Sequence, residues 1–109
     1  MADQLSSTFQ ALADPTRRAI LARLSRGEAT VKELAEPFDL SIQAISKHVK
    51  VLEEAGLIHK DRRAQLRVSS IKGAPLKDAA NWLLGYSSFF DDTLDRLDDH
   101  LKQQKGTKR

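Results

Sequence analysis

The sequence contains no cysteine, which excludes disulfide bonds, thiolate metal ligands and a cysteine nucleophile. It has only five glycines, three prolines, one tryptophan and one tyrosine, so it is neither collagen-like nor of low complexity. No apolar run approaches the ~20 residues that a membrane-spanning helix needs. Residues 1–4 lack the cationic start of a secretory signal peptide. We therefore expect a cytoplasmic protein with no membrane partner.

A chain of 109 residues has room for a single domain, which we place at residues 1–109. The charge is unevenly distributed along it: residues 1–72 carry 12 Lys/Arg against 9 Asp/Glu, and residues 73–104 carry 3 against 6. A basic front and an acidic back indicate one surface that meets an anion and another that avoids it.

Local signals predict four short helices in the first half of the chain. The first stops near Ala13, and a second begins after the Asp14 cap with Pro15 in its first turn and ends around residues 26–27. A third begins at residue 31, because Thr30 and Glu33 have the spacing of a capping box. Ser41 can cap a fourth helix, which runs to residue 55 and is stopped by glycine at residue 56.

Two strand-like runs and one long helix follow. Residues 57–62 and 66–71 are predicted to pair as a β-hairpin across residues 63–65. From residue 76 to about 103 the apolar residues follow a heptad pattern, which predicts a single C-terminal helix over residues 75–103, with a disordered tail at residues 104–109. So small a body cannot cover that stripe, and a second copy of the chain is the simplest partner. The expected homodimer contacts are Leu5, Phe9, Leu12, Leu83, Phe90, Leu94, Leu97 and Leu101.

The order α-α-α-α-β-β-α is that of a winged helix-turn-helix, a mainly α (α+β) fold with a long C-terminal dimerisation helix. At 100° per residue, the fourth helix turns Ile42, Ile45, Val49 and Leu52 inward. Gln43, Lys47, Lys50 and Glu54 face outward, with Ala44 and Ser46 on the shoulders. A face that is small, amide or cationic suits the major groove of double-stranded DNA, because Gln pairs with adenine, Lys donates to guanine or phosphate, and Ala touches a thymine methyl.

Further polar residues flank this helix. Thr30, Lys32 and Ser41 lie at helix starts, where side chains and terminal amides bind phosphates. The hairpin supplies Lys60, Arg62, Arg63 and Arg67, which either lie along the DNA or are simply solvated. Because these cations stand beside a helix-turn-helix, we favour DNA contact and expect a DNA-binding core at residues 5–72.

Two motifs resemble the ArsR/SmtB family of winged-helix repressors. They are FQALADPTRRAIL at residues 9–21, and LS at 40–41 followed by AISKHVKVL at 44–52 and AGLI at 55–58. The resemblance implies a homodimeric, cytoplasmic transcriptional repressor that places its recognition helix in the major groove of a palindromic operator. It also implies that the first and last helices form the dimer. The residues that match the family's DNA-contacting positions are Ser41, Gln43, Ala44, Ser46 and Lys47.

The sequence departs from that family at its metal sites. Residues 33–37 contain no Cys-x-Cys, and His100, beside Asp95, Asp98 and Asp99, has no spacing that fixes a zinc site. We therefore expect no metal, no cofactor and regulation by something other than a thiolate-bound metal; the effector is unknown. The wing also lacks the usual glycine, which predicts a tight or irregular turn.

Three alternatives stay open beside the repressor. In the first alternative, the chain is a protein-interaction module that has lost DNA binding, although its basic face argues against this. In the second, the acidic residues of the last segment bind a hard cation or pair with Arg96 and Lys102. We favour a solvated face that repels DNA. In the third, Trp82, Tyr86 and Phe89 line a pocket for an organic effector. We favour packing of these aromatic side chains in the core. An enzyme is not expected, because no nucleophile and base have a suitable spacing.

Overall fold

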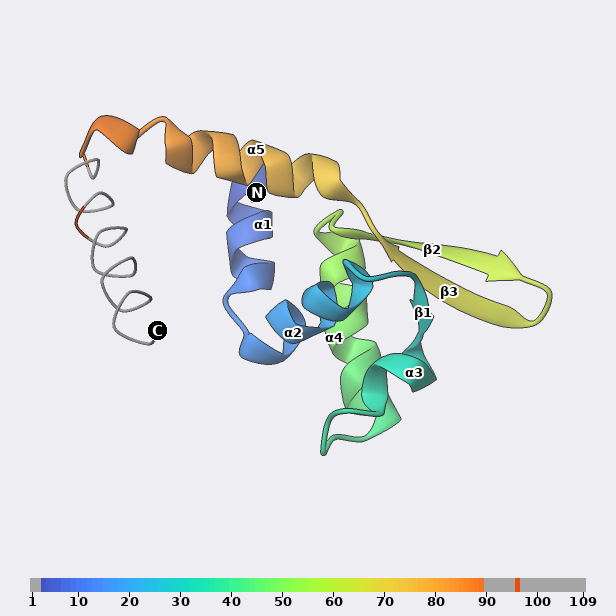
Figure 1. The fold of residues 1–109 in the computed structure, drawn as a ribbon. Coiled ribbons are helices and arrows are strands. Elements are labelled where there is room, and N and C mark those ends of the chain that lie inside the picture. The colour runs from blue at the N-terminus through green and yellow to red at the C-terminus, as the bar shows by residue number, and fades with distance from the viewer. Residues whose placement is uncertain (1–2, 90–95, 97–109) are drawn as a thin grey trace, which may run out of the picture. The chain divides into compact units, whose positions relative to one another are not determined.

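The computed structural model describes residues 3–89 and residue 96 (Figure 1). The protein is mainly helical with one small antiparallel sheet, which confirms the predicted fold class. The elements in chain order are α1 (Gln4–Leu12), α2 (Pro15–Leu24), β1 (Ala29–Thr30), α3 (Val31–Ala35), α4 (Ile42–Glu54), β2 (Ile58–Arg63), β3 (Leu66–Ile71) and α5 (Gly73–Leu84). Among the described residues, those up to Ala79 form one compact unit, and those from Ala80 onward belong to a second.

The helices begin where the capping signals predicted. Asp14 accepts a hydrogen bond from the backbone N–H of Arg17 at 3.0 Å and is followed by Pro15 in the first turn of α2. Thr30 and Glu33 form a complete capping box at the start of α3. The Ser41 hydroxyl accepts from the backbone N–H of Ala44 at 3.1 Å, so α4 starts at residue 42. Of the predicted ends, that of α2 is wrong: it ends at Leu24, two residues earlier.

Side chains from other elements satisfy the ends of α1 and α4. The Arg17 guanidinium donates to the carbonyl oxygens of Ala11 at 2.7 Å and Gln10 at 3.0 Å, which lie in the last turn of α1, where carbonyls lack the usual i+4 helical donor. Gln4 Nε2 donates to the carbonyl oxygen of Ala55 at 2.7 Å. These bonds hold α1 against the ends of α2 and α4.

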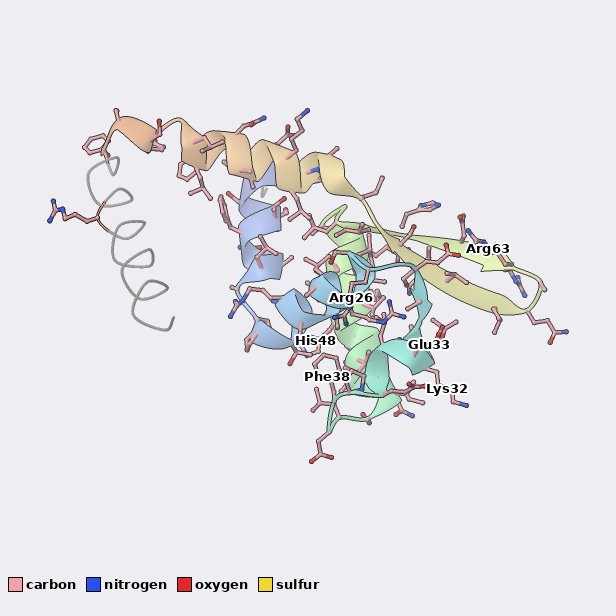
Figure 2. The ribbon with its side chains drawn as sticks, in the orientation of Figure 1. Arg26, Lys32, Glu33, Phe38, His48 and Arg63 are labelled. Atoms are coloured by element: carbon pink, nitrogen blue, oxygen red, sulfur yellow. The ribbon has the colours of Figure 1, made fainter. Side chains whose placement is uncertain are left out.

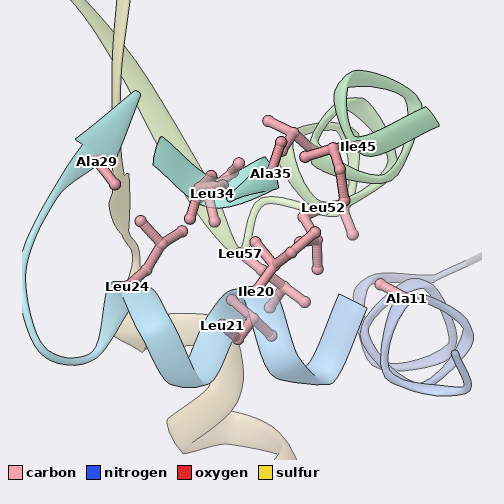
Figure 3. Close-up of a cluster of buried hydrophobic side chains, with 13 residues drawn as sticks. Ala11, Ile20, Leu21, Leu24, Ala29, Leu34, Ala35, Ile45, Leu52 and Leu57 are labelled. Atoms are coloured by element: carbon pink, nitrogen blue, oxygen red, sulfur yellow. The ribbon is translucent and has the colours of Figure 1, made fainter. Parts of the chain in front are cut away.

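The core lies between α2, α3 and α4 (Figure 3). Ile20, Leu34, Ile45, Leu52 and Leu57 are all fully buried there. The prediction that Ile42 also turns inward was wrong, since 51% of this residue is exposed. Ile42 is the first residue of α4, and no preceding turn of helix lies beside it to extend the buried face.

The sheet has the order β1-β3-β2, with β2 and β3 forming the predicted hairpin. β1 was not predicted; it is only two residues long and exists by pairing Ala29 with Ser69 and Thr30 with Val68. The hairpin turn is tight, as expected from its lack of glycine, and holds Ala64 at φ 55°. That left-handed conformation is uncommon for a residue with a Cβ atom. We call the hairpin of β2 and β3 the wing.

The predicted single helix over residues 75–103 is wrong in the part that the structure describes. α5 begins earlier, at Gly73, and ends at Leu84; a turn at residues 85–86 precedes further helical residues at 87–89. Gly85 is a weak helix former, and its N–H bonds are shared between the carbonyls of Asn81 and Trp82. No described helix combines the length and hydropathy needed to cross a bilayer.

Residues 80–89 expose much of their apolar surface. Trp82, Leu83, Tyr86 and Phe89 are 46%, 49%, 45% and 84% exposed, which contradicts the preferred expectation that the aromatic residues pack in the core. The rings of Trp82 and Tyr86 instead meet edge to face, with centroids 5.1 Å apart. The remaining predicted dimer contacts, namely Phe90, Leu94, Leu97 and Leu101, lie outside the described residues.

Candidate nucleic-acid interface

The rotation of α4 is fixed by its buried side. Ile45, Val49 and Leu52 have no exposed surface, and their spacing of four and three residues defines one inward stripe. The opposite side therefore faces solvent, and Gln43, Lys47 and Lys50 are all exposed there as predicted. Ala44 and Ser46 are half-buried at its edges, which is also as predicted.

The wing adjoins this side of α4 and closes a shallow hollow of about 440 Å³. We call it the cationic hollow; its lining residues are Gln43, Ser46, Lys47, Lys50, Glu53, Lys60 and Arg67. Six of these seven were predicted as DNA contacts from the sequence, and the fold brings them together from α4, β2 and β3. A concave surface with four Lys or Arg side chains is suited to an extended polyanion.

A second, smaller hollow of about 280 Å³ continues along the wing. Glu53, Lys60 and Arg67 line both hollows, and Asp61 and Arg62 join them in the second. The strand geometry explains this grouping, because residues 60 and 62 lie two apart on β2 and Arg62 pairs directly with Arg67 on β3. The three wing cations Lys60, Arg62 and Arg67 thus share one face.

Arg63 lies on the other face of the wing. Its guanidinium forms an ion pair with the Glu28 carboxylate, in the loop that precedes β1. Figure 2 shows Arg63 on the wing, well apart from Lys32 and Glu33 on α3. The structure therefore does not bring Arg63 into either hollow with the other predicted cations.

The three predicted phosphate contacts at helix starts have different surroundings. The Thr30 hydroxyl already donates to Glu33 Oε1 at 3.0 Å and accepts from the Glu33 N–H at 3.2 Å. The backbone and side-chain hydrogen bonds from Thr30 hold the pKa of the Glu33 carboxyl below its ordinary value, so a negative charge stands beside this threonine. Lys32 is exposed. Ser41 is also exposed, and a hydroxyl that accepts one bond still has a proton to donate.

His48 lies at the edge of the core, on the side of α4 that meets α2 (Figure 2). Its Nδ1 atom lies 3.4 Å from Arg17 Nη1 and 3.9 Å from Asp14 Oδ2. The backbone hydrogen bond from Arg17 and the nearby charges of His48 and Arg17 hold the pKa of Asp14 below its ordinary value. His48 thus helps to join α4 to the start of α2.

Two acidic residues that line the hollows, Glu53 and Asp61, were not predicted as part of the site. Glu53 lines both hollows, and its Oε1 atom lies 3.7 Å from Lys60 Nζ. The signal was present in the spacing, since residue 53 follows Ser46 by seven residues and so lies on the same side of α4. Helical projection alone had drawn attention to Glu54, which lines a different hollow beside α1.

Within residues 3–89, no group of three or more His, Asp or Glu side chains is placed to hold a metal ion. The residues considered for a cation site in the sequence, among them His100 and its neighbouring aspartates, lie outside the described residues.

The fold and the site together define a winged helix-turn-helix protein of the DNA-binding class. Residues 12–61 match a family model described as a helix-turn-helix domain. The chain is 36% identical to the transcriptional repressor SdpR of Bacillus subtilis over 90 residues, which is 83% of this chain and all of SdpR. The protein belongs to the ArsR family of transcriptional regulators.

Solved structures support the same assignment. The crystal structure of an ArsR family transcriptional regulator is 44% identical, has a TM-score of 0.75, and the match covers 82% of this chain and 98% of that one. A homodimeric winged helix-turn-helix DNA-binding domain from Mycobacterium bovis, a possible ArsR-family regulator, is 26% identical with a TM-score of 0.63 and coverages of 86% and 84%.

Proposed function

We propose that this protein is a homodimeric, sequence-specific transcriptional repressor that acts in the cytoplasm on a palindromic operator. The observation that carries the proposal is the cationic hollow, where the exposed side of α4 and one face of the wing form a continuous surface. In this proposal α4 enters the major groove and the wing lies along the flanking backbone.

The residue types assign different tasks to the two parts. Gln43 and Lys47 are exposed near the start of α4, where an amide reads adenine and an ammonium reads guanine or binds phosphate. Lys50, Arg62 and Arg67 bind phosphates, which position the protein without reading sequence, and Lys60 lies among them beside Glu53. Ser41 donates to a phosphate at the start of α4. Arg63 forms an ion pair with Glu28 and therefore contributes less to phosphate binding.

The proposed dimer rests on the apolar surface of residues 80–89. Leu83 and Phe89 are largely exposed, and a second copy of the chain covers them in this proposal. Two recognition helices then meet successive major grooves, with half-sites ~34–36 Å apart. The name of the M. bovis structure records a homodimer for that protein, which supports the same arrangement here.

Selection of bound duplexes from a random pool, with and without Zn²⁺, tests the proposal. We expect enrichment of an inverted repeat with half-sites one helical turn apart, in a yield that Zn²⁺ does not change. If no duplex is retained even at low salt, the protein is an interaction module instead. Loss of enrichment in Zn²⁺ would show that the chain holds a metal site after all.

A further inference from the structure

The cationic hollow contains one acid, and that acid is already engaged. Among the described residues that line this hollow, Glu53 is the only one with a carboxylate. It comes from the last turn of α4, and its Oε1 atom lies 3.7 Å from the Nζ atom of Lys60 on β2. The pair therefore links the proposed recognition helix directly to the wing.

The Glu53–Lys60 ion pair is partly shielded from solvent. The Lys60 side chain is only 20% exposed and that of Glu53 is 41% exposed, so the pair is partly enclosed in the hollow. A charge in such a partly enclosed site is screened less by salt than one on an open surface. Lys60 is thus neutralised at the place where a phosphate is expected to bind.

We propose that Glu53 is an electrostatic brake on DNA binding, which holds Lys60 away from phosphate and limits the affinity of the protein for duplexes. This inference rests on the proposed function and concerns the same site. A phosphate that enters the hollow competes with Glu53 for Lys60 and meets the carboxylate charge itself. Both effects weaken the complex, and they speed its dissociation.

Glu53→Gln keeps the size and shape of the side chain but removes its charge. Glu54→Gln is the matched control, because it removes the same charge from the next position of α4, where the side chain lines a hollow beside α1 and α2 rather than the DNA face. The two variants have equal net charge. Any difference between them therefore comes from the position of the carboxylate.

Fluorescence anisotropy measures the binding of each variant to a labelled mixed-sequence duplex of about 30 base pairs, long enough for two major grooves, and to the duplex recovered by selection. We expect Glu53→Gln to bind both roughly three- to tenfold more tightly than the wild type at low salt. Its slope of log K against log salt is steeper by about 0.9 per protomer, since each protomer gains one cation for phosphate. Glu54→Gln stays close to the wild type.

A charge-balanced rescue tests the partnership. Lys60→Gln alone leaves Glu53 unpaired in the hollow, so we expect weaker binding than in the wild type. Adding Glu53→Gln to it restores wild-type affinity, whereas adding Glu54→Gln does not. Equal rescue by both would show a general charge effect and overturn the inference.

The two failures are distinguishable. A wild type that binds neither duplex overturns the proposed function, and the brake with it. A wild type that binds DNA while Glu53→Gln matches Glu54→Gln overturns the brake alone. Circular dichroism of every variant confirms that a loss of binding is not a loss of fold.

Discussion

Arg62 and Arg67 lie directly opposite each other across β2 and β3. Like charges in directly opposed cross-strand positions destabilise a sheet. The two guanidinium groups also share the face of the wing that Lys60 occupies, and the hollow there is lined by these three cations together with the carboxylates of Glu53 and Asp61. An anion on this face relieves their repulsion, and in the proposed function that anion is the DNA backbone.

Replacing Arg67 with threonine removes this repulsion and places a β-branched residue in the strand. We expect the free energy of unfolding to rise by about 0.2–1 kcal/mol, while affinity for DNA falls. Urea denaturation and anisotropy measure the two effects. Arg63→Thr is the control: it removes the same charge from the neighbouring strand, β2, but also breaks the ion pair with Glu28, so its stability does not rise.

The double variant Lys47→Ala with Arg62→Ala removes one cation from α4 and one from the wing. We expect DNA affinity to fall by roughly tenfold or more in 0.15 M salt, because each lost cation removes a phosphate contact and the counterion release that accompanies it. The slope of log K against log salt becomes shallower for the same reason. Both side chains are exposed, so the dimer remains intact in sedimentation. Monomers in that experiment would mean that these residues were assigned to the wrong surface.

Ser41 has two separable tasks, to cap α4 and to contact phosphate. Ser41→Ala removes the cap and lowers the free energy of unfolding by about 1 kcal/mol. Ser41→Asp retains the cap and hence stability, but its negative charge weakens DNA binding. If Ser41→Asp binds DNA as tightly as the wild type, no phosphate lies near this residue.

The cap at Asp14 predicts a loss of stability in acid. Its pKa is lowered from 3.8 in the folded protein, chiefly by the backbone hydrogen bond from Arg17. The unfolded chain therefore binds a proton more readily, and stability falls as pH drops below that value. Asp14→Asn still caps α2 but does not titrate, so its unfolding midpoint should change less between pH 5 and pH 3. Parallel curves for the two proteins would rule Asp14 out as a source of the acid sensitivity.

Much of the fold was predictable because its signals are local. The caps at Asp14, Thr30 and Ser41 each depend on residues within one turn of helix, and the structure has all three in place. β1 was not predictable in this way. Two residues carry no strand pattern, and Ala29 is in a strand only because Ser69 of β3 lies beside it.

The candidate site divides along the same line. Helical periodicity correctly separated the buried Ile45 from the exposed Lys47. It misplaced Ile42, whose burial depends on whether another element reaches the start of α4. It also overlooked Glu53, whose role in the site depends on its ion pair with Lys60 of β2. The break after Leu84 shows the opposite case, since a heptad pattern outweighed the local effect of Gly85 in the prediction.

The central claim is that α4 and the wing form one surface for duplex DNA, presented twice by a dimer. The most direct test is to titrate the selected duplex with wild-type protein over a range of salt concentrations and to determine the stoichiometry. The account predicts two protomers per duplex and a log K that falls linearly and steeply with log salt, because cations of both α4 and the wing release counterions. Binding that does not depend on salt, or a single protomer saturating the duplex, would contradict it.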